Sequence, residues 1–412
     1  MAFAKALLLA LLSASSVLGH SHHHHDDDET VPEDKRAELL MKWEQEWSFS
    51  GISTFAHMKP VKCLLEPDEL YDIAIIGAPF DTAVSYRPGA RFGPRAIRAA
   101  SARQLPGTSF NARAGINPYL SWATLRDCGD IPITPFDNAL AERQMYEAFL
   151  ELGTRPAKSI APATASRDNI GKGRPKLVTL GGDHSVALPA LRALYQIYQK
   201  PITVLHFDAH LDTWNPVRYA SYWLSEQSSF NHGSFFHIAS SEGLICNATS
   251  AHAGIRTRLT GADDSDYTTP GTPEQGFMRI HADDIDDMGP AGVVDSIIDR
   301  IGLDPSQPVY LSVDIDVLDP GTAPGTGTPE PGGWTTREMI RILRGIERLN
   351  LVGADIVEVS PSYDNVGETT ALAAAQVAFE IITSMVKAGS AQENLGWYGK
   401  AGKKERGGKD EL

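Results

Sequence analysis

Cysteine is scarce in this chain of 412 residues, with Cys63, Cys128 and Cys246 as its three cysteines. A small fold held together by many disulfides is therefore excluded. An odd count leaves at least one thiol without a partner inside the chain, and the spacing allows one disulfide without identifying it. Cys128 lies in a strand-like run from Ala123 to Asp130, where we interpret it as a small buried apolar side chain.

The chain also lacks an excess of positive charge and, after its start, a long hydrophobic run. Its 37 Lys and Arg stand against 52 Asp and Glu, and the net charge of -15 argues against nucleic acid or an anionic membrane as the main partner. The acidic balance is compatible with a small cationic substrate. No segment beyond the N-terminus is predicted to span a membrane.

Both ends of the chain carry short targeting patterns. Residues 1–19 contain a lysine, a short apolar stretch and small residues at the end, which predicts a secretory signal peptide. The last four residues, Lys409-Asp-Glu-Leu412, match the signal for retention in the endoplasmic reticulum. We therefore expect the protein to pass through the secretory pathway and reside in the lumen of the endoplasmic reticulum.

The flanking segments have little that could pack into a core. Residues 20–45 begin with a run rich in His and Asp, for which we predict disorder; a metal-scavenging tail is the alternative. Residues 389–412 are predicted to form a flexible tail that exposes the retention signal. The sequon Asn247-Ala-Thr249 would be glycosylated only if it lies on a surface loop.

From Leu70 onward, short apolar strands alternate with helices. The predicted strands are 71–76, 176–180, 202–207, 278–281, 309–313 and 352–359, and the predicted helices are 91–104, 139–152, 186–198, 292–301, 335–349 and 369–388. This alternation predicts an α/β fold: a three-layer, doubly wound, mostly parallel sheet with helices on both faces. Ligands of such folds bind at the carboxyl ends of the strands.

Acidic and histidine side chains gather after three of these strands. They lie in Gly181-Gly-Asp-His-Ser185, Asp208-Ala-His-Leu-Asp212 and Asp314-Ile-Asp316. Side chains two apart on an extended segment point to the same face, and carboxylates desolvated side by side repel one another. A bound cation removes that cost. Four carboxylates and two imidazoles suit two hard divalent ions, with Mn²⁺ as the first choice.

These strings, together with Ser312 to Pro320 and Glu358-Val-Ser-Pro-Ser-Tyr-Asp364, resemble those of the ureohydrolases, the family of arginase and agmatinase. The resemblance covers about residues 71–385 and implies an arginase-like fold, with residues 46–388 as the catalytic domain. It implies two Mn²⁺ per chain, whose ligands would be His184, Asp208, His210, Asp212, Asp314 and Asp316. We also expect the chain to form a homo-oligomer.

The resemblance also implies roles in catalysis for three residues. Glu358 would bind the guanidinium of the substrate and orient its carbon. Asp212 would accept a hydrogen bond from a hydroxide that bridges the two metals and attacks this carbon. His232, in Asn231-His-Gly233, would protonate the departing amine. His206 and His237 are interpreted as core or surface residues.

Within the family, the agmatinase branch fits best. Residues 87–98 look like its signature loop, although the arginines of this loop could equally pair with acids. Arginases tend to place an asparagine where this chain has Trp214, and an indole offers a single donor for the carboxylate of arginine. The sequence therefore predicts hydrolysis of agmatine to putrescine and urea.

Several alternatives remain open. Guanidinobutyrase or another guanidino-acid ureohydrolase is the runner-up, ahead of arginase. A lumenal metal-binding protein without turnover would keep the same ligands. A phosphatase of the haloacid dehalogenase type could explain Asp314-Ile-Asp316 but leaves His184, His210 and Asp212 without a role.

Overall fold

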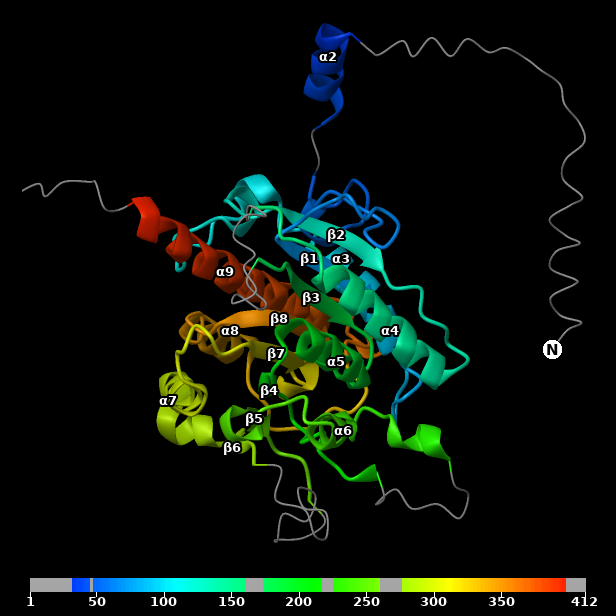
Figure 1. Ribbon diagram of the computed structural model, residues 1–412, viewed down its shortest axis with the longest axis vertical. Coiled ribbons are helices and arrows are strands. Elements are labelled where there is room, and N and C mark those ends of the chain that lie inside the picture. The colour runs from blue at the N-terminus through cyan, green and yellow to red at the C-terminus, as the bar shows by residue number, and fades with distance from the viewer. Residues whose placement is uncertain (1–31, 45–46, 160–172, 217–224, 260–275, 398–412) are drawn as a thin grey trace, which may run out of the picture. The chain divides into compact units, whose positions relative to one another are not determined.

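An eight-stranded parallel sheet forms the centre of the larger of two compact units, Trp47–Leu412 (Figure 1). The computed structural model describes residues 32–44, 47–159, 173–216, 225–259 and 276–397. The strand order is β2-β1-β3-β8-β7-β4-β5-β6, and every pairing is parallel. The strands are β1 (Ile73–Ala78), β2 (Leu125–Asp130), β3 (Lys176–Gly181), β4 (Thr203–Phe207), β5 (Ala251–Ile255), β6 (Met278–His281), β7 (Val309–Asp314) and β8 (Leu351–Val357).

Two groups of helices cover the sheet, one on each face (Figure 1). One group comprises α4 (Asn138–Gly153), α5 (Ala187–Tyr198) and α6 (Phe235–Ser241), and the other comprises α3 (Gly93–Ser101), α7 (Asp284–Ile301), α8 (Thr336–Gly345) and α9 (Thr369–Trp397). The alternation of strand side chains explains the two layers: Ile73 and Ile75 of β1 join the core under the second group, while Ala74 and Ile76 join the core under the first. The predicted three-layer, doubly wound fold is confirmed.

The smaller unit, Met1–Glu46, contains helix α2 (Glu33–Trp43). The prediction of disorder is therefore wrong for these residues, because charged side chains at helical spacing, such as Lys35, Glu38 and Lys42, pair along the helix. Residues 20–31 and the predicted signal peptide lie outside the described residues. The predicted tail is also wrong at its start, since α9 continues to Trp397; residues 398–412 lie outside the described part.

Helix α9 corrects the expectation about hydrophobic runs. Its segment Thr369–Gly389 is long and apolar enough to cross a membrane, with a mean hydropathy of 1.4. However, 83% of that window is buried within the protein, where Ala374, Val377 and Ile381 belong to the core beneath the sheet. Its apolar side chains are buried against α3, α8 and the sheet, as expected for a core helix.

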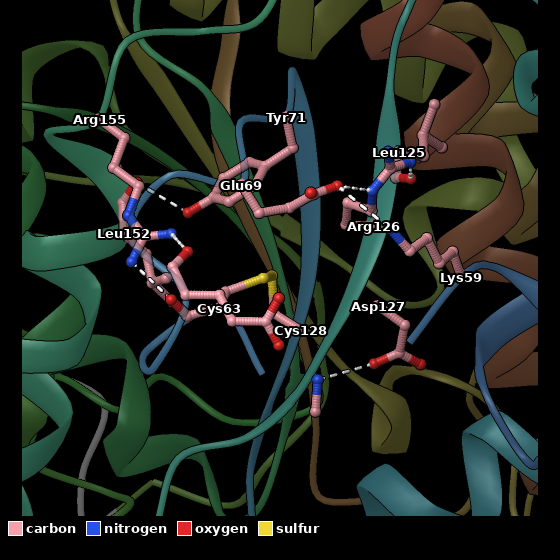
Figure 2. Close-up of a disulfide and its surroundings, with 12 residues drawn as sticks. Lys59, Cys63, Glu69, Tyr71, Leu125, Arg126, Asp127, Cys128, Leu152 and Arg155 are labelled. Carbon is pink, nitrogen blue, oxygen red and sulfur yellow. Dashed lines mark hydrogen bonds and ion pairs between the residues drawn. A yellow bond between two sulfur atoms is a disulfide. The ribbon is translucent and has the colours of Figure 1, made fainter. Parts of the chain in front are cut away.

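A disulfide joins Cys63 to Cys128 and corrects our interpretation of Cys128 (Figure 2). Cys128 is buried, as predicted, but it is oxidised, and its partner lies 65 residues earlier in the chain. The bond holds the segment before β1 against the edge strand β2. The backbone N–H of Phe55 donates to Asp127 Oδ2 at 2.7 Å, so the segment is fixed at a second point. Cys246 is the free cysteine.

Candidate metal and substrate site

The predicted site residues meet at the carboxyl ends of four neighbouring strands, β3, β8, β7 and β4. His184 follows β3, Glu358 follows β8, Asp314 ends β7 and Asp208 follows β4. Gly182 allows this convergence because a Cβ at that position would lie 1.8 Å from the carbonyl oxygen of Phe80. Four segments distant in sequence thus deliver their polar side chains to one buried place.

The first group of ligand atoms surrounds His184. Its Nδ1 lies 3.1 Å from Asp208 Oδ2, 3.1 Å from Asp212 Oδ2 and 3.2 Å from Asp314 Oδ2. The Ser312 hydroxyl donates to Asp355 at 2.7 Å and must therefore accept from Nε2 of His184, also at 2.7 Å. This arrangement leaves Nδ1 of the neutral ring with a lone pair that faces three carboxylate oxygens.

The second group surrounds His210. Its Nδ1 lies 3.2 Å from Asp208 Oδ1 and 3.0 Å from Asp316 Oδ2. Asp208 therefore belongs to both groups, with one carboxylate oxygen directed to each. The six residues predicted as ligands are brought together, in the arrangement that two adjacent cations would require.

The charges of this site favour bound cations. Burial raises the pKa of Asp212, Asp314 and Asp316, and neighbouring carboxylates raise it further, to about 6 for Asp316. Nδ1 of His184 is buried without a hydrogen-bond partner, although three carboxylate oxygens lie within 3.2 Å of it. An orphaned ligand atom in a cluster of acids and histidines fits divalent metal ions.

Glu358 lies beside these groups and is 1% exposed. Its Oε1 accepts a hydrogen bond from the backbone N–H of His184 at 2.9 Å and another from Nδ1 of His232 at 3.2 Å. Its Oε2 is buried without a partner. Glu358 has a φ of 61° and Asp212 a φ of 54°, a left-handed conformation that non-glycine residues adopt rarely and that clusters at functional sites.

His232 bridges Glu358 and the loop that follows β1. The backbone N–H of Ser85 donates to Nε2 of His232 at 3.0 Å, so the neutral ring carries its proton on Nδ1. Burial lowers the pKa of His232, but the Glu358 carboxylate outweighs it and raises the pKa to about 9. The Ser85 hydroxyl, 2.8 Å from Nε2, can accept the N–H that Nε2 gains on protonation. The Glu358 carboxylate thus favours the protonated form of His232.

Two features of the site are absent from the sequence predictions. Ser85 contacts His232 through its backbone N–H at 3.0 Å and its hydroxyl at 2.8 Å, and the separation of 147 residues between the two carries no motif that would pair them. His206 lies in the first group, with Nε2 2.8 Å from Asp208 Oδ2, although we had interpreted it as a core or surface residue. Its position two residues before Asp208 on one strand was a usable signal, because such side chains share a face. His237 lies half-buried on α6.

The loop predicted as an agmatinase signature divides into two parts. Arg91 pairs with Asp81, and Arg98 pairs with Asp127 at 2.9 Å, so these two arginines have structural partners. Arg87 instead lies over the rings of Tyr86 and Tyr363, 5.0 and 5.1 Å from their centroids. Trp214 is half-buried, with its ring 6.3 Å from that of His210.

Comparison with known proteins places the chain in a family. The family model described as "Arginase family" matches residues 71–383. "Putative agmatinase 3" of Schizosaccharomyces pombe is 48% identical over 342 residues, which cover 82% of this chain and 81% of the relative. "Agmatinase" of Chromobacterium violaceum is 36% identical over 340 residues, covering 82% and 90% respectively.

A solved structure agrees with these relationships. Proclavaminate amidinohydrolase from Streptomyces clavuligerus superimposes with a TM-score of 0.68 at 34% identity, covering 83% of this chain and all of that one. The chain therefore belongs to the arginase family of amidinohydrolases.

Proposed function

We propose that this protein hydrolyses agmatine to putrescine and urea with the help of two Mn²⁺ ions. The observation that carries the proposal is the unpartnered, buried Oε2 of Glu358 beside two groups of acidic and histidine ligands. A buried carboxylate oxygen without a donor suits a planar guanidinium, which offers several N–H groups.

Two sets of residues would hold the metals. His184, Asp208, Asp212 and Asp314 would form one site, and His210, Asp208 and Asp316 the other, with Asp314 close to both. Free water is a poor nucleophile. Bound divalent ions would lower the pKa of a water molecule and so make it a better one. The oxygen-rich ligand set favours Mn²⁺ over Zn²⁺.

The protein's own groups would orient and protonate the substrate. Glu358 would bind the guanidinium and hold its carbon toward the metal ligands. Asp212 would orient the attacking water by accepting a hydrogen bond. His232, whose protonated form Glu358 favours, would protonate the departing amine.

Agmatine is favoured by the names of the relatives and by Trp214. The S. pombe and C. violaceum relatives bear the name agmatinase. Agmatine and arginine share a guanidinium, but arginine also carries a carboxylate beside its amine. Trp214 offers one indole N–H to such a group, so a buried carboxylate would be left incompletely paired.

A specific observation supports 4-guanidinobutyrate as the second candidate. A Cβ on Gly327 would lie 2.9 Å from the Arg87 carbonyl oxygen and 3.3 Å from Glu358 Oε2, so the Arg87 backbone and the Glu358 carboxylate flank one glycine. The guanidinium of Arg87, which lies over the rings of Tyr86 and Tyr363, is the group that would meet a terminal carboxylate. A "Guanidinobutyrase" of Pseudomonas aeruginosa is 35% identical over 329 residues.

Metal dependence tests the proposal. Wild-type protein stripped with a chelator should release no urea from agmatine, and Mn²⁺ should restore release better than Zn²⁺. Bound metal is counted per chain in the same samples. Full urea release from metal-free protein would contradict the proposal, and so would a fully loaded protein that releases none.

We also propose residence in the lumen of the endoplasmic reticulum and assembly as a homo-oligomer. The disulfide between Cys63 and Cys128 supports an oxidising compartment. Exposed apolar side chains on α2, such as Met41 and Trp43, support a surface that another chain covers. Residues 1–19 would be the signal peptide that directs the chain there.

A further inference from the structure

Two buried histidines beside the proposed metal ligands, His206 on β4 and His252 on β5, have no role in the proposed hydrolysis. The register of the two strands places them side by side, and their Nδ1 atoms lie 2.7 Å apart. Both are 0% exposed. At this distance a proton must lie between the two nitrogens, so each ring is a hydrogen-bond partner of the other.

Aromatic rings enclose this pair. Phe236 lies edge-on to His206 at 4.8 Å, and Phe277 stacks on His252 at 4.3 Å. A buried polar ring in such surroundings is costly unless its nitrogens are satisfied. An apolar side chain would fill either position without that cost, so packing alone does not account for two imidazoles.

His206 also reaches the metal ligands. It precedes Asp208 by two residues, so both side chains lie on the same face of the chain. Nε2 of His206 is 2.8 Å from Oδ2 of Asp208, the carboxylate common to both ligand groups. A lone pair on Nε2 would repel this oxygen, whereas a proton there is attracted. The proton between the rings is therefore carried by His252 and accepted by Nδ1 of His206.

We propose that His206 is a positioning residue that fixes Asp208 for both metal ions, and that His252 holds His206 in turn. The inference rests on the metal ligation in the proposed function. Partners of metal ligands fix their orientation, and loss of such a partner typically lowers metal affinity about 10- to 100-fold. Because Asp208 is shared, both sites should weaken together.

The test measures Mn²⁺ binding to full-length protein stripped of metal. His206→Phe keeps a ring but removes the donor, and it should weaken both sites about 10- to 100-fold. His206→Gln keeps an N–H near the position of Nε2 and should retain most of the affinity. His281→Gln, which changes an exposed histidine on β6, is the matched control and should bind as wild type. Calorimetric titration gives the affinities, and metal analysis gives the ions per chain.

Two results would overturn the inference. One is wild-type affinity for both ions in folded His206→Phe protein. The other is loss of a single ion with the second site unchanged, which would make His206 a direct ligand of one site. Circular dichroism of the stripped variants checks folding.

The role of His252 provides a second route if His206→Phe does not fold. His252→Asn keeps an N–H near Nδ1, whereas His252→Phe does not, so the Asn variant should bind Mn²⁺ more tightly. Equal affinity in the two would also overturn the inference. Urea release from agmatine is assayed separately in the wild-type protein, and its absence would reject the proposed function. Weaker Mn²⁺ binding by His206→Phe would still support the positioning role of His206.

Discussion

At the scale of single residues, Glu358 connects the metal ligands to the substrate. Its Oε1 is occupied by His184 and His232, and its buried Oε2 is without a partner. An oxygen in this state should bind a cationic group strongly, because a charge-assisted hydrogen bond in a buried site is stronger than one in water.

We predict that Glu358→Gln keeps the metals but loses turnover. The amide has similar volume but no charge for the guanidinium, so kcat/KM for agmatine should fall at least about 100-fold, a loss of about 3 kcal/mol. Steady-state rates and metal content are measured on the same preparation. A variant with wild-type kcat/KM would exclude Glu358 as the guanidinium ligand.

The charge of His232 gives a pH prediction. Its pKa is raised to about 9, so the protonated ring persists through neutral pH and is lost as the pH rises through that value. If it donates the proton, kcat/KM should fall above a pH of about 9. His232→Asn should be slow and should lack this alkaline limb. An unchanged limb in the variant would assign it to another group.

At the scale of elements, sequence patterns located most strands and helices but missed some. The predicted helix 139–152 and strand 278–281 correspond closely to α4 and β6, because apolar periodicity and flanking polar residues mark them. β5 and α6 were missed. The run Ala251–Ile255 contains His252 and Gly254, whose low hydropathy conceals a fully buried strand. Tertiary contacts, not local pattern, stabilise it.

Sequence patterns likewise predicted only part of the functional site. All six expected metal ligands converge, because carboxyl ends of parallel strands lie at one edge of the sheet. His206 was missed although its spacing from Asp208 was a usable signal, whereas the Cys63–Cys128 pairing depends on which distant segments become neighbours. Spacing along the chain does not contain that information.

The disulfide provides a prediction about the edge of the sheet. It closes a loop with a separation of 65 residues, for which the chain-entropy contribution is about 4 kcal/mol. Cys63→Ser should therefore lower the free energy of unfolding by about 2–4 kcal/mol, measured by denaturant titration. Cys246→Ser, which changes the free cysteine, is the control and should have little effect. Equal stability of Cys63→Ser and wild type would show that the bond is not stabilising.

At the scale of the whole molecule, we propose that the terminal sequences of this arginase-family chain direct it to the secretory pathway. The buried disulfide is compatible with this compartment, and the signals themselves lie outside the described residues. Deletion of residues 409–412 should release the protein into the medium, because the proposed retention would depend on those four residues. Immunoblots of medium and cell fractions measure the change. Full-length protein in the cytosol would contradict lumenal residence.

The substrate is the central question at this scale, and one comparison decides it. Agmatine, 4-guanidinobutyrate and arginine are assayed for urea release by the Mn²⁺-loaded wild-type protein, and kcat/KM is determined for each. Agmatine should be preferred over arginine by on the order of 10⁴, because the arginine carboxylate would be buried without a full set of donors. It should also exceed 4-guanidinobutyrate. A higher kcat/KM for 4-guanidinobutyrate would favour the second candidate substrate, and a higher value for arginine would contradict the proposed function.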